Sequence, residues 1–258
     1  MSAAQTRLAT SPMLLRLAEE HATGALLRDQ GVLYLSQGHV VHAESPAAPG
    51  IDVLLTTGGM LPPQGWQDAL SQAGPRHAVG QHLIDSGRVA AGELELCHLG
   101  ALFDAAFFVL EPPGGATRFR YGVAHWLGQI HPVPAMTVAR ETRRRRELLD
   151  SVWPDSVIDT APVVPRAPAP GQMIGDRQRE VLRLADGSRT PTEIAWALGR
   201  PAFHTLLEVR RLAAAGLVHT PRPPEPVDPP VALWCVQPSE DPDIALLRRV
   251  RDALEASP

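Results

Sequence analysis

The chain has 258 residues, of which 44% are hydrophobic and 20% charged, a composition typical of a globular protein with room for two modest domains. Its formal net charge of −4 at pH 7 excludes an overall positive field that would draw the protein to nucleic acid or anionic lipid. All 24 residues counted as Lys plus Arg are arginines. The absence of lysine excludes two enzyme classes, the Walker-type nucleotide hydrolases and the Schiff-base enzymes.

The cysteines and the N-terminal segment indicate the compartment. Cys97 and Cys235 form no CxxC pair, and we expect both to be free thiols in a reducing environment. The N-terminal residues lack the charged start and the unbroken apolar stretch of a secretory signal, and no segment approaches 18 uncharged apolar residues. These patterns predict a cytoplasmic protein without membrane insertion.

The first half of the chain predicts a small sheet packed with helices. Residues 12–21 have apolar positions at helical spacing and predict a short helix. Three β-prone runs separated by turn sequences then predict an antiparallel meander, over 25–28, 32–35 and 39–43. Further helices are expected over 50–59 and within 61–110, followed by an extended segment over 115–123.

A long helix and a proline-rich segment close the first domain, which we place at 1–153. The pattern over 135–152 predicts one solvent-facing helix, and its basic run is Arg143, Arg144, Arg145 and Arg146. A solvated helix face is the ordinary interpretation of such a run, and a patch for phosphate or an acidic partner is the alternative. The alternate prolines over 161–171 favour an extended spacer, so 154–171 is predicted to be a linker.

The second domain is predicted over 172–222. Thr190 and Glu193 form a capping box with Pro191 at the first helical position, so a helix begins there. Gly199 ends this helix, and a second helix runs from Pro201 to Gly216. Residues 223–258 are predicted to hold a second proline tract, a strand over 231–236 and an amphipathic helix over 241–256, which would dock on its own domain or on a partner.

The first domain resembles a known family. The order of a short helix, three strands and further helices is similar to the PATAN domain of bacterial signalling proteins, over residues 11–152. The resemblance is carried by Gly24, Leu26, the hydrophobic strand that closes on Gly38, residues 40–43 and the terminal segment TRFRYGV. The resemblance implies a protein-interaction or regulatory domain without catalytic residues. Residues 79–100 also look like the paired-helix repeat of type II secretion ATPases, some of which bind cyclic di-GMP, although only one copy is recognisable here.

The second domain resembles a winged-helix, helix-turn-helix unit, including the closing sequence RRLAAAGLV. Winged helices bind either DNA or protein, so the exposed face of the second helix has to discriminate between the two. When the residues of the second helix are placed at 100° intervals, one side of the helix faces the core of the domain. The residues on and next to the opposite side form the candidate binding face: Arg200, Phe203, His204, Leu207, Arg210 and Arg211. Leu207 and the neighbouring Glu208 dilute its cations, which favours a protein partner over duplex DNA.

Few chemical motifs stand out. His39 and His42 lie three apart on a strand, so they should point to opposite faces and cannot share a metal ion without a bulge. Cys97 and His98 are neighbours on a predicted helix and point apart, which argues against a zinc site with His77 and His82. The chain has no GxSxG, HExxH or GxGxxG motif.

The sequence therefore predicts an α+β protein: a small antiparallel meander with packed helices, then a mostly α winged-helix domain and a C-terminal helix. We expect a non-enzymatic regulatory protein of a bacterial signalling pathway that acts through a protein partner, with no cofactor and no metal. A transcriptional regulator that binds duplex DNA through the winged helix is the alternative. The sequence also allows a homodimer.

Overall fold

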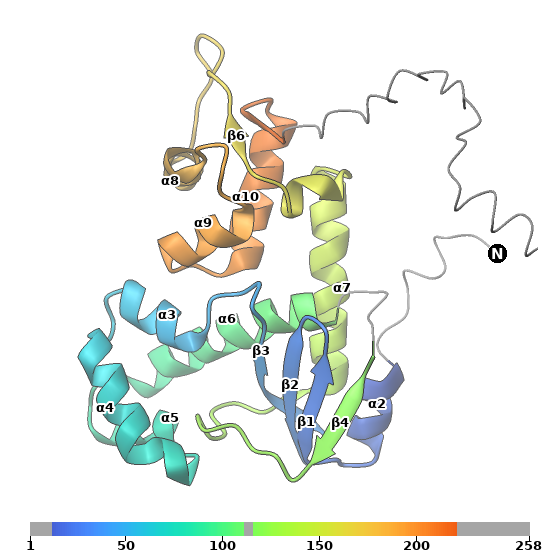
Figure 1. Ribbon diagram of the computed structural model, residues 1–258, viewed down its shortest axis with the longest axis vertical. Coiled ribbons are helices and arrows are strands. Elements are labelled where there is room, and N and C mark those ends of the chain that lie inside the picture. The colour runs from blue at the N-terminus through green and yellow to red at the C-terminus, as the bar shows by residue number, and fades with distance from the viewer. Residues whose placement is uncertain (1–11, 111–115, 221–258) are drawn as a thin grey trace, which may run out of the picture. The chain divides into compact units, whose positions relative to one another are not determined.

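A computed structural model of the chain describes residues 12–110 and 116–220 (Figure 1). These residues belong to one compact unit, and the fold class is α+β, as the sequence predicts. No helix in the described part of the chain has the length and apolar character needed to cross a bilayer. The proline tract, strand and helix expected over 223–258 lie outside the described residues, as does Cys235.

An antiparallel sheet forms the base of the first domain. The predicted meander is present as three consecutive strands, and two strands from later in the chain extend it on both sides in the order β4-β1-β2-β3-β5. A short helix, α2, precedes the meander as predicted. The bounds are α2 Pro12–Glu19, β1 Gly24–Arg28, β2 Gly31–Ser36, β3 His39–Glu44, β4 Arg118–Tyr121 and β5 Val133–Pro134.

Strand β3 carries an irregularity that matters for the site. Tyr34 of β2 lies opposite His42, but the next residue, Leu35, lies opposite Val40. Val41 is therefore an extra residue on β3, which is the definition of a β-bulge. A bulge re-aims the side chains that follow it, here His42 and Glu44.

Helices cover the sheet and form a group beside it (Figure 1). The long helix α6 packs on β2 and β3. The helix α7 packs against α6, α2 and the strands β3 and β5. The helices α3, α4 and α5 share a second core with α6, centred on Leu55, Leu83 and Leu94. The helix predicted over 135–152 has those bounds. The bounds are α3 Ile51–Thr57, α4 Pro63–Ala73, α5 Val79–Asp85, α6 Ala91–Val109 and α7 Ala135–Val152, with a 3-10 turn, η1, over Gly74–Arg76.

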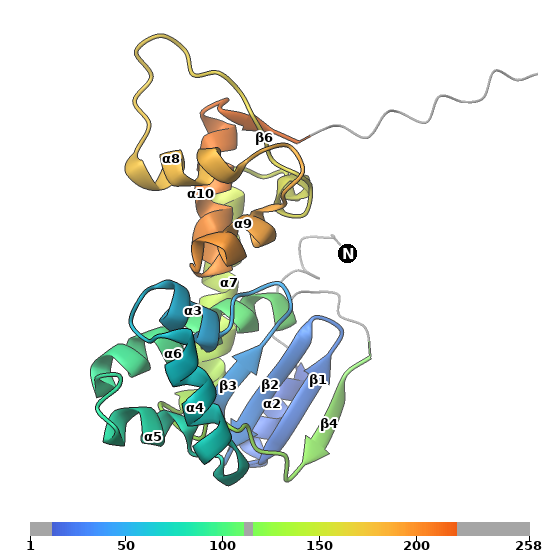
Figure 2. The same ribbon diagram turned by 60° about the vertical axis from the view of Figure 1, so that its left-hand side comes forward.

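A helical module follows, and Figure 2 shows its helices gathered beside β6. The predicted capping box is confirmed, because Thr190 Oγ1 accepts the Glu193 amide at 3.3 Å and a Glu193 carboxylate oxygen accepts the Thr190 amide at 2.7 Å. Gly199 ends α9 in the left-handed conformation. The elements of the module are η2 Ser156–Asp159, β6 Val164–Pro165, α8 Asp176–Leu184, α9 Pro191–Leu198, α10 Ala202–Ala214 and β7 Val218–His219.

The prediction of a free spacer over 154–171 is wrong for its central part. Val163 and Ile158 are buried in the core of the helical module, and β6 pairs with β7. The burial of the two apolar side chains fixes the segment on the module. The extended conformation that prolines favour is compatible with the short strand β6, because a proline is tolerated on an edge strand. The segment is therefore part of the module that it was expected to precede.

Candidate functional site

Three histidines come together beside the bulge of β3. The ring of His42 stacks on that of His125, with centroids 4.0 Å apart, and on that of His98, with centroids 5.5 Å apart. His98 lies on α6, and its Nε2 bonds the carbonyl of the bulged residue Val41 at 2.8 Å. His125 comes from the loop between β4 and β5. Strand, helix and loop thus each contribute one imidazole.

A carboxylate completes the cluster. His125 Nε2 donates to Glu44 Oε1 at 2.9 Å, and the hydroxyl of Tyr34 donates to Glu44 Oε2 at 3.1 Å. The other nitrogen of His125, Nδ1, accepts the amide of Leu127 at 3.3 Å. These bonds assign the proton of His125 to Nε2 and hold the carboxylate of Glu44 in one orientation.

Burial determines the protonation of the cluster. His42 is 3% exposed and His98 fully buried. Burial and the two neighbouring imidazoles hold the pKa of His42 well below its usual value, and burial lowers the pKa of His98 to about 4. The hydrogen bond from His125 lowers the pKa of Glu44, whereas burial and the charge of Glu44 raise the pKa of Tyr34 to about 12. At neutral pH the site therefore holds neutral His42 and His98 beside an ionised carboxylate.

His42, Glu44 and His125 also form a group of metal-ligand type. One ligand atom of each lies within 4.8 Å of the other two. His42 Nδ1 is buried and has no hydrogen-bond partner. The exposed His39 is not in this group, and its Nδ1 lies 3.1 Å from the Gln37 carbonyl. The expectation that His39 and His42 point to opposite faces is wrong, because the bulge at Val41 places them opposite Ser36 and Tyr34, which are two apart on β2 and so share a face.

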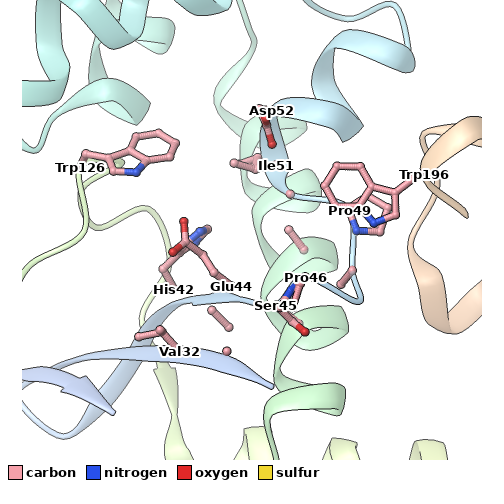
Figure 3. Close-up of a pocket in the computed structure, with 16 residues that line it drawn as sticks. Val32, His42, Glu44, Ser45, Pro46, Pro49, Ile51, Asp52, Trp126 and Trp196 are labelled. Atoms are coloured by element: carbon pink, nitrogen blue, oxygen red, sulfur yellow. The ribbon is translucent and has the colours of Figure 1, made fainter. Parts of the chain in front are cut away.

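A pocket of about 400 Å³ adjoins the cluster (Figure 3). Its volume is in the range of small-molecule sites. His42 and Glu44 lie on the strand side, and Trp126 and Trp196 stand on opposite sides of the pocket. Trp196 belongs to α9, so the helical module supplies part of the wall. The remaining wall is mostly apolar and comes from the segment before α3, from α6 and from β2.

The predicted binding face on α10 lies elsewhere, and its apolar members are not on the surface. Phe203 is 5% exposed and Leu207 8% exposed. Both pack with Phe107 of α6 and Leu149 of α7 in a cluster that joins the two parts of the chain. The prediction that these two side chains are exposed is wrong. The helix packs on the core of its own module with one side, and the first domain buries a second side that helical spacing alone could not identify.

The cations of that face are opposed by carboxylates. Arg210 is 3% exposed, binds both oxygens of Asp159 and donates to the carbonyl of Trp153 at 2.6 Å, so its placement on a binding face is wrong. Arg200 pairs with Glu180 at 2.6 Å, and Arg211 pairs with Glu208 at 2.8 Å. His204 is the exposed member of the set without such a pair among the described residues.

The basic run on α7 divides between surface and interior. Arg143 and Arg144 are exposed and pair with glutamates of the same helix. Arg145 is largely buried, lies 3.7 Å from Asp104 and stacks its guanidinium on the Phe203 ring at 4.6 Å. Arg146 donates to the carbonyl of Phe107 at 3.0 Å. The four arginines therefore do not form one continuous basic surface.

Asp104 is the residue that joins α6 to α10. Its carboxylate accepts the backbone amides of Ala202 and Phe203, at 2.5 and 2.8 Å, and it is fully buried. These amides are at the start of α10, where a helix has unsatisfied donors and a positive dipole end. Burial raises the pKa of Asp104 to about 6, against the lowering effect of the two amides and of Arg145.

Sequence reasoning missed four of these residues: Tyr34, Glu44, Asp104 and His125. The spacing of His42 and Glu44, two apart on a strand, places both on one face and could have been noticed. His125 is 81 residues from Glu44, and Asp104 is 98 residues from Ala202. No local pattern reports such pairings.

Comparisons with known proteins leave the chain without a relative that could assign these features. No protein-family model matches it, and neither the curated proteins nor the solved structures give a match.

Proposed function

We propose that this chain is a non-enzymatic regulatory protein of a bacterial signalling pathway that acts by binding another protein. The observation that carries the proposal is the docking of α10 by Asp104. A helix-turn-helix protein reads bases with the N-terminal residues of its second helix, which enter the major groove. Here the corresponding end of α10 is bound to α6, and Phe203 and Leu207 are buried beside it.

Charge supports the same conclusion. Binding to a phosphate backbone uses cations that are free to replace counterions. Arg200, Arg210 and Arg211 each have a carboxylate partner within 4 Å, and Arg143 and Arg144 have partners as well. A duplex would have to compete with these pairs.

The edge strand β4 is the surface best suited to a protein partner. It pairs with β1 on one side, and within the described residues its other side carries no strand. Arg118, Arg120 and Tyr121 are exposed, and the two arginines have no ion pair in the described part of the chain. An open edge with arginines and an aromatic ring fits an extended acidic segment added to the sheet.

The test compares the β4 edge with a control arginine. The full chain is used to capture proteins from its native lysate after nuclease treatment, and a captured partner is purified and titrated against variants. We expect Arg118→Glu with Arg120→Glu to weaken binding of that partner at least tenfold, while Arg144→Glu on α7 leaves it unchanged. Equal binding by both variants would contradict the assignment of the β4 edge.

A second measurement tests the alternative function. Fluorescence anisotropy with duplex DNA is recorded over a salt series with the full chain. We expect weak binding without sequence preference. Tight binding that falls steeply with salt, and that is lost in Arg200→Ala or Arg211→Ala with the fold intact, would establish the DNA-binding regulator instead.

A further inference from the structure

We propose that His42, Glu44 and His125 form a binding site for a divalent transition-metal ion of the zinc class, with one coordination position open to the adjoining pocket. The site is independent of the β4 edge and of α10. It therefore stands or falls separately from the proposed function.

The donor set is the first argument. Zinc is bound by imidazole nitrogen and carboxylate oxygen, and sites with three protein ligands leave a fourth position for water or another small ligand. Bonds of about 2.1 Å at tetrahedral angles place ligand atoms roughly 3.4 Å apart. His125 Nε2 and Glu44 Oε1 are 2.9 Å apart, and all three ligand atoms lie within 4.8 Å of one another. These spacings lie on both sides of the tetrahedral value, so the set is near coordination distance without being at it.

The unpartnered nitrogen of His42 is the second argument. A buried polar atom without a partner costs free energy, so native structures contain few of them. His42 is 3% exposed and its Nδ1 lacks a hydrogen bond. Coordination through Nδ1 would supply the partner that this nitrogen lacks.

Groups behind the ligands hold them in place, as outer-shell partners do in metal sites. Tyr34 donates to Glu44 Oε2 and leaves Oε1 directed toward His125. His98 stacks on His42 and fixes the carbonyl of the bulge from which His42 projects. On the other side, His42 and Glu44 line the pocket, which gives room for the fourth ligand.

Binding has a defined cost. The rings of His42 and His125 are stacked with an angle of 25° between their planes, so at least one ring must turn before both lone pairs point at one ion. The metal also replaces the Nε2 proton of His125, and the contact of Nδ1 with the Leu127 amide must give way when Nδ1 becomes a donor. We therefore expect weaker binding than at a closed structural zinc site, and weaker binding at lower pH because ligands must lose protons.

The experiment uses the chelator-treated full chain. Zinc is titrated in competition with a chromophoric chelator, and cobalt is added separately because its visible absorption reports tetrahedral coordination. We expect one ion per chain and a higher melting temperature with zinc. His42→Gln and Glu44→Gln should each weaken binding about 100-fold, and Tyr34→Phe about tenfold. His39→Gln, an exposed position on the same strand, is the matched control and should bind as the wild type does.

Circular dichroism verifies that each variant folds. If a variant of a ligand residue does not fold, the effect of Tyr34→Phe on zinc affinity still tests the site. Two results would overturn the proposal. One is the absence of zinc binding at millimolar concentration. The other is equal loss in His39→Gln and His42→Gln, which would indicate adventitious binding to surface histidines.

Discussion

Two neighbouring arginines of α10 have opposite surroundings. Arg210 is buried and makes charge-assisted hydrogen bonds to Asp159 and Asp150, whereas Arg211 is exposed and pairs with Glu208 one turn away. A buried ion pair that loses one member leaves the other charge without compensation. An exposed pair contributes little, because water screens it. Adjacent residues of one type therefore differ in their effect on stability.

This contrast gives a matched stability prediction. Arg210→Ala should lower the free energy of unfolding by about 3–5 kcal/mol, because it leaves Asp159 and the Trp153 carbonyl without their hydrogen-bond partner. Arg211→Ala should change it by less than about 0.5 kcal/mol. Urea unfolding of both variants measures the difference, and similar values would contradict the burial of Arg210.

Asp104 predicts a pH dependence. Its pKa in the folded chain is about 6, above the ordinary value of 3.8, so between these values the folded state holds a proton that the unfolded state has released. Its contribution to stability is therefore greatest at low pH and is lost as the pH rises through 6. The protonated group keeps one oxygen to accept an amide of α10.

The measurement is the difference in unfolding free energy between the wild type and Asp104→Asn. We expect this difference to move in favour of the wild type by about 1 kcal/mol from pH 7 to pH 5. Other titrating groups cancel because both proteins contain them. A difference that shrinks on acidification would show that the amides, and not burial, dominate the pKa of Asp104.

At the scale of the helix, the capping box of α9 is testable on its own. The side chain of Thr190 satisfies an amide that has no partner within the helix. Thr190→Ala should cost about 1 kcal/mol of stability, and Thr190→Ser, which keeps the hydroxyl, should cost little. Thermal unfolding of the pair checks this, and an equal loss in both would point to the methyl group instead.

The elements show what a single sequence can predict. The meander, α7 and the start of α9 were predicted because turn residues, helical spacing and the capping box are local signals. The folding of the segment around Val163 into the module was not, because β6 finds its partner in β7 at the far end of the module. The cluster around His42 was missed for the same reason: β3 was recognised, but the loop that supplies His125 carries no periodic pattern.

At the scale of the whole molecule, the two parts of the chain share an apolar joint. Phe203, Leu206 and Leu207 of α10 pack with Phe107 and Leu149 of the first domain. Gly199 also lies against Thr57 of α3, where a Cβ would collide with the threonine side chain. Parts that share buried surface lose it together, so they should unfold in one cooperative step.

Calorimetry tests this joint. The wild type should show a single transition, and Leu207→Asp should separate it into two, because a carboxylate in the apolar cluster of Phe107 and Leu149 is costly to bury. The control is Leu148→Asp on α7, next to Leu149. Leu148 is 38% exposed, so this variant should keep one transition. A single transition in Leu207→Asp would show that the joint does not couple the two parts.

The bond between Asp104 and the start of α10 limits how such a chain can change by recombination. A breakpoint in the segment after α7 looks harmless in the sequence, since prolines dominate there. Exchanging the downstream part as a cassette would nevertheless leave the aspartate of α6 facing a foreign helix, unless that helix offers two free amides at the same place. Viable chimaeras should therefore inherit α6 and α10 from the same parent.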